Sequence, residues 1–205
     1  RVRASSTPSS RLTCSSPTPI WLSATSPWMP AVLGEPYFDV SPVYVWVAAF
    51  FQTALSPWAA DVYSASRFAT VLFTAIGLTG CGMAGYRFLG RHQGRSVVLI
   101  LIGCAGLIMS GHFLGGMSVV FAALGMCLYG FSLVQTRVIM AALLLGAGWA
   151  LLSLSAGWLL AAAFMLMALG LPLSRQWRIK RYYITLIGAF AVALPLMSVY
   201  PFALY

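Results

Sequence analysis

The chain has 205 residues, of which 60% are hydrophobic and 7% are charged. Because a soluble domain carries charge on roughly a quarter of its residues, this composition excludes a water-soluble fold, whose exterior needs far more polar surface. The net charge of +9 comes from basic residues in small clusters between apolar runs, which favours topogenic charge near an anionic membrane leaflet and argues against a nucleic-acid partner.

Residues 1–33 are rich in serine, threonine and proline and have neither a helical nor a strand period. Such a segment buries too little apolar surface to offset its conformational entropy, so we expect it to be disordered or irregular. It also lacks an apolar core long enough for a signal peptide.

Residues 34–67 form the second expected unit, an outer loop that contains one short helix. Gly34–Pro42 is too irregular for a helix, whereas the run from Pro42 to the residues before Pro57 predicts a helix that begins at a proline. At about fourteen residues it is shorter than the roughly 20 needed to cross a bilayer. We therefore expect it to lie in the membrane interface or to pack under a loop.

Long apolar runs, separated by basic or glycine-rich turns, predict about six membrane spans in residues 68–205. The expected spans are Phe68–Tyr86, Val97–Gly111, Met117–Val134, Val138–Leu152, Trp158–Leu173 and Tyr182–Tyr200. The predicted fold class is all-α: a polytopic transmembrane helix bundle, preceded by the short amino-terminal interfacial helix.

The positions of lysine and arginine predict the orientation of the chain. Basic residues fall in the turns after the first, third and fifth expected spans, and the turns after the second and fourth contain none. By the positive-inside rule, the basic turns face the cytoplasm. Residues 1–67, which hold the chain's three carboxylates Glu35, Asp39 and Asp61, are then expected on the outer side of the cytoplasmic membrane.

Small residues inside the expected spans predict close helix packing. Gly77, Cys81 and Gly85 recur at four-residue spacing, and Gly146 and Gly148 lie together in a later span. Residues of this size let helices approach where lipid supplies no hydrophobic drive for association. The four cysteines are widely spaced without a C-x-x-C pair, so we expect neither a disulfide nor a thiolate zinc site.

One segment carries residues that suggest a chemical function. Gly34–Trp46 reads G-E-P-Y-F-D-V-S-P-V-Y-V-W. It resembles the motif G-x-P-Y-F-E-K-P-P-L-x-Y-W in the first large outer loop of polyprenyl-phosphate-dependent membrane glycosyltransferases, the C-type fold enzymes that include protein O-mannosyltransferases and the aminoarabinose–lipid A transferase. Trp58–Phe68 is similar to the family segment that ends in an arginine before a span. The resemblance covers residues 34–200.

The resemblance implies transfer of a sugar from a polyprenyl-phosphate donor to a lipid or protein acceptor. Asp39 occupies the position of the motif's acid and is expected to be the catalytic carboxylate or a ligand of a divalent metal ion. Arg67 matches the family's arginine and is expected to contact phosphate, while Tyr37 and Tyr44 are expected to line the substrate cavity. The chemistry needs a carboxylate to take the acceptor's proton and a cation to neutralise the departing phosphate.

The chain also departs from the family pattern. Val40 replaces the motif's lysine, and Ser41 replaces one of its two prolines. The family's catalytic base lies in an acidic motif upstream of this stretch, whereas residues 1–33 contain no Asp or Glu. We therefore expect a truncated copy of a family member, and we interpret residues 1–33 as read out of frame.

Two other functional classes stay open. The first is a non-enzymatic membrane subunit, or an inactive remnant, with the same scaffold. The second is a small-molecule transporter, which is kept open by Gly- and Pro-interrupted spans but disfavoured because no ionisable residue lies in the middle of an expected span. Asp61 is expected to cap the helix that leads into the first span, and His112 to be an interfacial polar residue.

Overall fold

The computed structural model describes residues 31–32, 35–36, 41–55, 62–90, 92–104, 116–173, 177 and 179–204. Within these residues the chain is almost entirely helical. The helices are α1 (Pro42–Leu55), α2 (Val62–Leu89), α3 (Gln93–Gly103), α5 (Met117–Leu133), α6 (Val138–Ala156), α7 (Trp158–Gly170), the 3-10 helix η2 (Leu171–Leu173) and α8 (Lys180–Leu204). Two short antiparallel strands, β1 (Ala31–Val32) and β2 (Glu35–Pro36), precede them.

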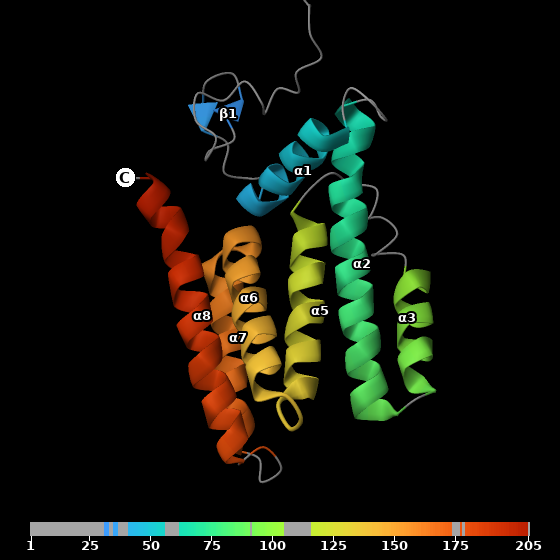
Figure 1. Ribbon diagram of the computed structural model, residues 1–205, viewed down its shortest axis with the longest axis vertical. Helices are drawn as coiled ribbons and strands as arrows, with labels where there is room; N and C mark the ends of the chain where they lie inside the picture. The colour runs from blue at the N-terminus through green and yellow to red at the C-terminus, as the bar shows by residue number, and fades with distance from the viewer. Residues whose placement is uncertain are drawn as a thin grey trace, which may run out of the picture.

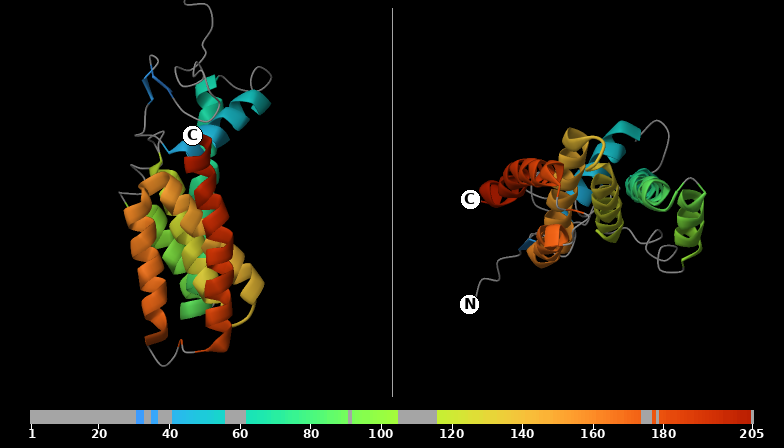
Figure 2. Two further views of the ribbon diagram at one scale, coloured as in Figure 1. Left: turned by 90° about the vertical axis from the view of Figure 1, so that its left-hand side faces the viewer. Right: turned by 90° about the horizontal axis from the view of Figure 1, so that it is seen from below.

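The helices stand side by side with their axes roughly aligned, except for α1, whose axis is oblique to the others (Figure 1). Helix α5 packs between α2 and α6, and α6 packs in turn against α8 and α7, while α3 lies on the far side of α2. Seen from below, α8, α6, α5, α2 and α3 therefore follow one another in a row (Figure 2). Helix α1 lies obliquely across the upper ends of its neighbours (Figure 1).

Three segments are long and apolar enough to cross a membrane: Ser66–Leu89 in α2, Val138–Ala156 in α6 and Lys180–Ser198 in α8. The described parts of α3, α5 and α7 are shorter, with 11, 17 and 13 residues. A transmembrane helix needs roughly 17–25 residues, so α5 stands at the lower limit, and α3 and α7 fall below it. The architecture is that of an all-helical membrane protein, with three helices among the described residues that are long and apolar enough to cross a bilayer.

The helix ends follow the local sequence rules. Helix α1 begins at Pro42, whose missing N–H costs nothing in a first turn, and it ends at Leu55. Helix α6 ends at Ala156, where Gly157 adopts a φ of 85° that a side chain would disfavour. The expected starts at Met117, Val138 and Trp158 are all confirmed.

Four helices, α2, α3, α6 and α8, extend beyond the limits of their expected spans. Helix α2 begins at Val62, before the expected start of the span at Phe68, and α6 ends at Ala156, one turn beyond Leu152. Helix α8 runs from Lys180 to Leu204 through Pro195 and beyond the expected end at Tyr200. Helix α3 begins at Gln93 and is described to Gly103. The remainder of the expected second span, together with His112, lies outside the described residues.

Glycines let the neighbouring helix backbones touch. A Cβ placed on Gly80 would lie 2.6 Å from the carbonyl oxygen of Gly125, and one on Gly146 would lie 2.7 Å from the carbonyl oxygen of Ala189. On the other side of α2, a Cβ on Gly85 would lie 3.0 Å from Val97 Cγ2. The close packing expected from the small residues is therefore present at the α2–α5, α6–α8 and α2–α3 contacts.

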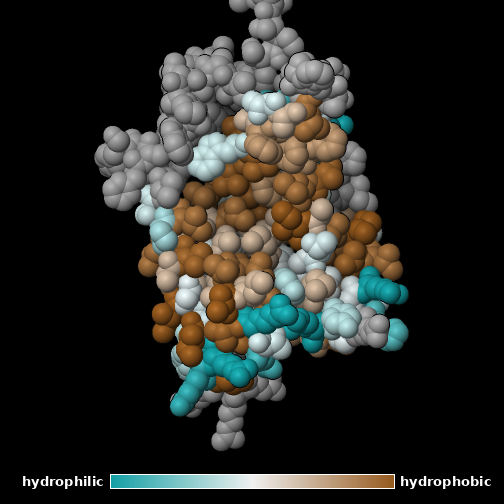
Figure 3. All heavy atoms as spheres, viewed as in Figure 1, coloured by the Kyte–Doolittle hydropathy of each residue, from teal (hydrophilic) through white to brown (hydrophobic). Residues whose placement is uncertain are grey.

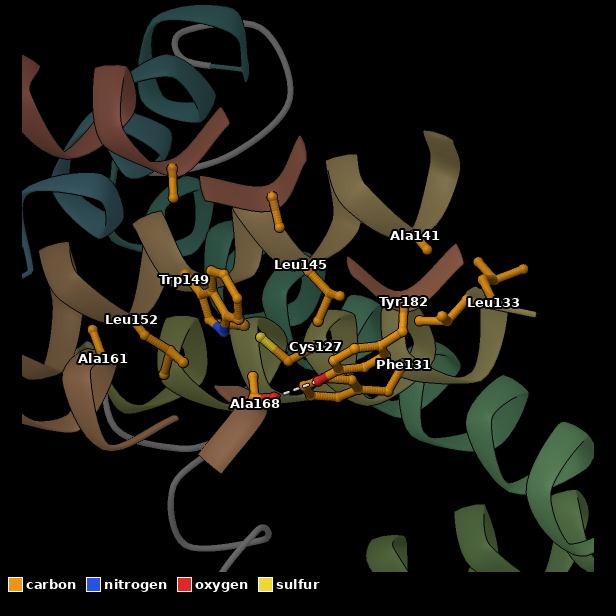
Figure 4. Close-up of a cluster of buried hydrophobic side chains, with 14 residues drawn as sticks. Cys127, Phe131, Leu133, Ala141, Leu145, Trp149, Leu152, Ala161, Ala168 and Tyr182 are labelled. Atoms are coloured by element: carbon orange, nitrogen blue, oxygen red, sulfur yellow. Dashed lines mark hydrogen bonds between the residues drawn. The ribbon is translucent and has the colours of Figure 1, made fainter. Parts of the chain in front are cut away.

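The main core lies between α5, α6, α7 and α8 (Figure 4). Trp149 is fully buried there, with its ring centre 5.2 Å from that of Phe190. The Tyr182 hydroxyl donates a hydrogen bond to the carbonyl oxygen of Ala168, which ties the start of α8 to the end of α7 (Figure 4). Cys81 and Cys127 are buried free thiols, and Cys104 is an exposed one.

Apart from Arg67 near the start of α2, the described Lys and Arg residues gather at one end of the bundle. Hydrophilic side chains form a band in the lower part of Figure 3, opposite the end that carries α1. We call this the basic end; its described cations are Arg87, Arg95, Arg137, Lys180 and Arg181, all exposed. This grouping agrees with the charge pattern from which the orientation was predicted.

Candidate functional site

Two of the residues expected to carry chemistry, Arg67 and Tyr44, belong to the described part of the chain, and both lie at the α1 end. Asp39 and Tyr37 lie outside the described residues. Arg67 is exposed on the second turn of α2, one helical turn before Thr70, and Tyr44 lies in the first turn of α1. The structure therefore places Arg67 and Tyr44 on two helices that pack against each other.

Helix α1 buries one face against the bundle. Tyr44, Ala48 and Gln52, spaced four residues apart, are buried, whereas Phe50 is exposed. The four-residue spacing puts the buried side chains on one side of the helix. Helix α1 thus packs against α2 and α6, and its buried face shares a core with residues of α5. Its expected place in the membrane interface or under a loop stays a prediction.

The hydroxyl of Tyr44 is used inside the protein. It shares a buried hydrogen bond of 2.9 Å with the Thr70 hydroxyl of α2, and the ring contributes to a core of α1, α2 and α5 residues. Tyr44 is 5% exposed, so its described contacts join α1 to α2. Its expected role as a wall of a substrate cavity stays a prediction.

Ser41, which replaces a proline of the family motif, also has a structural partner. Its Oγ lies 2.9 Å from Ser155 Oγ at the end of α6. A proline could not form this contact, because it has no side-chain hydrogen-bonding group. The substitution thus fixes the start of α1 to a helix 114 positions away in the chain.

Buried polar side chains are concentrated at this end of the bundle. We call them the α1 polar cluster: Ser41, Gln52, Ser66, Thr70 and Ser118. Neither amide atom of Gln52 has a hydrogen-bond partner among the described residues. Because leaving a buried polar group unpaired is unfavourable by about 1–3 kcal/mol, Gln52 marks a position where a further polar group is needed.

Sequence reasoning missed the α1 polar cluster. Its signal was the four-residue spacing of Ser66 and Thr70 at the start of a helix long enough to span a membrane. Hydroxyls at that spacing share a face, and such residues usually bond across to another helix. Gln52 gave a second signal, as an amide on the same face as Tyr44 and Ala48.

The described residues offer limited means of holding a metal ion. No three His, Cys, Asp or Glu side chains lie together in the part of the chain searched. The structure does not describe the side chains of Glu35, Asp39 and Asp61. The expected role of Asp39 as a ligand of a divalent ion stays a prediction.

Comparison with protein-family models, curated proteins and solved structures finds no match to this chain.

Tyr44→Phe tests whether the Tyr44–Thr70 bond holds α1 in place. We expect the free energy of unfolding to fall by about 1 kcal/mol, because the Thr70 hydroxyl loses its buried partner. Thr70→Val should have a similar effect, and the double variant should cost much less than the sum of the two. Thermal unfolding of the purified protein in detergent measures all three.

Tyr86→Phe is the matched control, since Tyr86 is exposed on the same helix α2. It should leave the unfolding midpoint nearly unchanged. Strictly additive effects of Tyr44→Phe and Thr70→Val would show that the two hydroxyls do not stabilise each other.

Proposed function

We propose that the chain is a membrane glycosyltransferase that moves a sugar from a polyprenyl-phosphate donor to a lipid or protein acceptor. The observation that carries this proposal is the Gly34–Trp46 motif, in which Asp39 stands at the acid position and Tyr37 two residues before it. The motif leads directly into α1, which packs at the end of the bundle opposite the basic end. That arrangement suits a loop outside the cytoplasmic membrane.

The proposed reaction is a displacement with inversion at the anomeric carbon. The acceptor oxygen forms a bond to that carbon while the bond to the phosphate oxygen breaks, and the acceptor's proton passes to the carboxylate of Asp39. Negative charge then grows on the polyprenyl phosphate. Arg67 is our candidate for stabilising this charge, because it is an exposed guanidinium at the same end as the motif.

The six-span topology belongs to this proposal. In chain order the helices alternate in direction: α2, α5 and α7 run away from the α1 end, and α3, α6 and α8 run back toward it (Figure 1), as consecutive spans must when short turns connect them. In this topology the α1 polar cluster lies near the outer headgroups. The amide of Gln52, which has no hydrogen-bond partner among the described residues, is our candidate for a hydrogen bond to the sugar or the acceptor.

A non-enzymatic membrane subunit on the same scaffold is the second candidate. It is favoured by the contacts of Tyr44 and Ser41, whose hydroxyls are engaged by Thr70 and Ser155. These contacts give Tyr44 and Ser41 a structural role in docking α1, and such a role does not require catalysis. An activity assay separates the two candidates.

Asp39→Ala is expected to abolish sugar transfer. Loss of a general base typically lowers the rate by about 10²–10⁴-fold. Membrane vesicles containing the full chain, supplied with a radiolabelled polyprenyl-phosphate sugar, measure the transfer. Asp61→Ala is the matched control and should retain activity, because Asp61 stands outside the motif.

Three results would contradict the proposal. Unchanged turnover in Asp39→Ala would remove the site assignment, and absence of turnover in the unmodified chain would favour the non-enzymatic subunit. A protease site inserted after Gly34 should be cut from the outer side of sealed cells. Cutting only after lysis would overturn the orientation and the sugar-transfer proposal together.

A further inference from the structure

A pocket of about 290 Å³ opens at the basic end, away from the proposed reaction site. It is lined by Arg87 and Phe88 of α2, Phe131 and Ser132 of α5, Gln135 of the following turn, and Trp177 before α8. Three separate stretches of the chain therefore converge on it. Ligand pockets for drug-sized molecules begin at roughly 300 Å³, so this one suits a small group.

Hydrogen bonds hold the rim of the pocket in shape. Arg87 Nη1 donates to Thr136 Oγ1 at 2.8 Å, and Arg181 Nη1 donates to the carbonyl oxygen of Gln135 at 2.9 Å. The guanidiniums of α2 and α8 thus both fix the turn between α5 and α6. Because a guanidinium has five N–H groups, Arg87 keeps further donors for a ligand.

Three of the six residues that line the pocket are aromatic: Phe88, Phe131 and Trp177. The rings of Phe88 and Trp177 lie 6.4 Å apart between their centres, and Trp177 meets Tyr182 edge-on at 5.8 Å. Ser132 is already donating to the Tyr129 carbonyl oxygen. The polar side chains left to bind a ligand are therefore Arg87 and Gln135, which both offer N–H donors.

The charge around the pocket selects for an anion. Arg87, Arg137 and Arg181 are exposed at this end, and the chain has no Asp or Glu after Asp61. The helix dipoles act in the opposite direction, because the carboxyl-terminal ends of α2 and α5 meet here and repel an anion. Among the described residues, Arg87 is the one cation in the pocket lining, so anion binding should depend on it.

We propose that this pocket binds the phosphate of an anionic glycerophospholipid headgroup. The pocket lies at the end of Ser66–Leu89, a segment long enough to span the bilayer, which places Arg87 at headgroup depth. Guanidinium and amide donors suit phosphate oxygens, and the rings of Phe88 and Trp177 suit the boundary between headgroup and acyl chain. Soluble phosphate has the same chemistry but gains nothing from the aromatic walls.

Lipid binding to the full chain in nanodiscs tests the proposal. The nanodiscs contain phosphatidylcholine with increasing fractions of phosphatidylglycerol, and retained lipid is measured by native mass spectrometry. Arg87→Gln should bind phosphatidylglycerol about tenfold more weakly, the loss expected for one charged hydrogen bond. Arg95→Gln removes the same charge from the same end outside the pocket lining and should bind as tightly as the unmodified protein.

A further variant and a soluble ligand distinguish binding in the pocket from unspecific attraction to the leaflet and from binding of free phosphate. Trp177→Ala leaves Arg87 in place and should also weaken lipid retention. This variant therefore tests the pocket if Arg87→Gln does not fold. Equal losses in Arg87→Gln and Arg95→Gln would overturn the pocket in favour of unspecific attraction to the leaflet. Arg87-dependent binding of millimolar inorganic phosphate in pure phosphatidylcholine would overturn the lipid assignment.

Discussion

Gly125→Leu is expected to prevent α2 from packing against α5. Even a Cβ at this position would lie 2.5 Å from the carbonyl oxygen of Gly77 and 2.9 Å from its Cα. Both are backbone atoms, so a change of rotamer cannot relieve the overlap and the helices must separate. Overpacking usually costs about 1–3 kcal/mol, and we expect this substitution to reach or exceed the upper end of that range.

The yield of folded protein and its unfolding midpoint in detergent measure this effect. Gly170→Leu is the matched control, because a Cβ on Gly170 of α7 has no other atom within 4 Å. Gly125→Ala should destabilise the protein less than leucine but more than the control. Equal unfolding midpoints for Gly125→Leu and Gly170→Leu would mean that α2 and α5 do not approach this closely.

Trp149→Ala is the second substitution with a large expected effect. Trp149 is 0% exposed in the core between α6 and α8, so its removal leaves a cavity. Truncations of buried aromatic residues cost about 3–5 kcal/mol in soluble proteins. The packing part of that cost persists in a bilayer, where van der Waals contacts between helices supply the association energy.

Trp149→Phe separates packing from hydrogen bonding. The indole Nε1 of Trp149 has no hydrogen-bond partner among the described residues, so phenylalanine removes a buried unpaired donor while keeping most of the ring volume. We expect Trp149→Phe to cost less than half as much as Trp149→Ala. Chemical unfolding in mixed micelles measures both.

Trp158→Ala provides the comparison for an exposed tryptophan. Trp158 is 73% exposed at the start of α7, and its replacement should change stability by about 0.5 kcal/mol or less. A loss in Trp149→Phe as large as that in Trp149→Ala would show that the indole N–H has a partner.

Several helix boundaries could be predicted because the sequence marks them with proline, glycine or charge. Pro42 begins α1, Gly157 separates α6 from α7, and Arg137 precedes α6. Each of these signals acts within one helical turn, so the boundary can be predicted from the local sequence without knowledge of tertiary contacts. The gathering of arginines at one end was predictable for the same reason.

The limits of α2 and α8 were harder to predict, because they depend on tertiary packing. Pro195 lacks the N–H that would bond one turn back, yet α8 continues through it while Ala189 and Ala193 of the same helix pack fully buried in the core. Neighbouring helices often compensate for proline in membrane spans. Hydropathy likewise predicted six spans but could not say that only three of the described helices would have the full length.

The site was predictable only as far as a local motif reaches. Tyr44 and Arg67 were identified from such motifs, whereas Thr70 and Ser155 became visible only once α1 was seen to contact α2 and α6. These contacts join residues 26 and 114 positions apart. Pairing at such distances depends on how the helices dock, which periodicity along one helix does not encode.

The one-sided charge of the bundle has an electrical consequence. In the proposed orientation, the five cations Arg87, Arg95, Arg137, Lys180 and Arg181 sit where an inside-negative resting voltage attracts them. Carrying one elementary charge through 100 mV costs about 2.3 kcal/mol, so inverting the whole array would cost on the order of 10 kcal/mol. An energised cell would thus lock the insertion direction after synthesis, and collapse of the resting voltage would remove that restraint without altering a single contact.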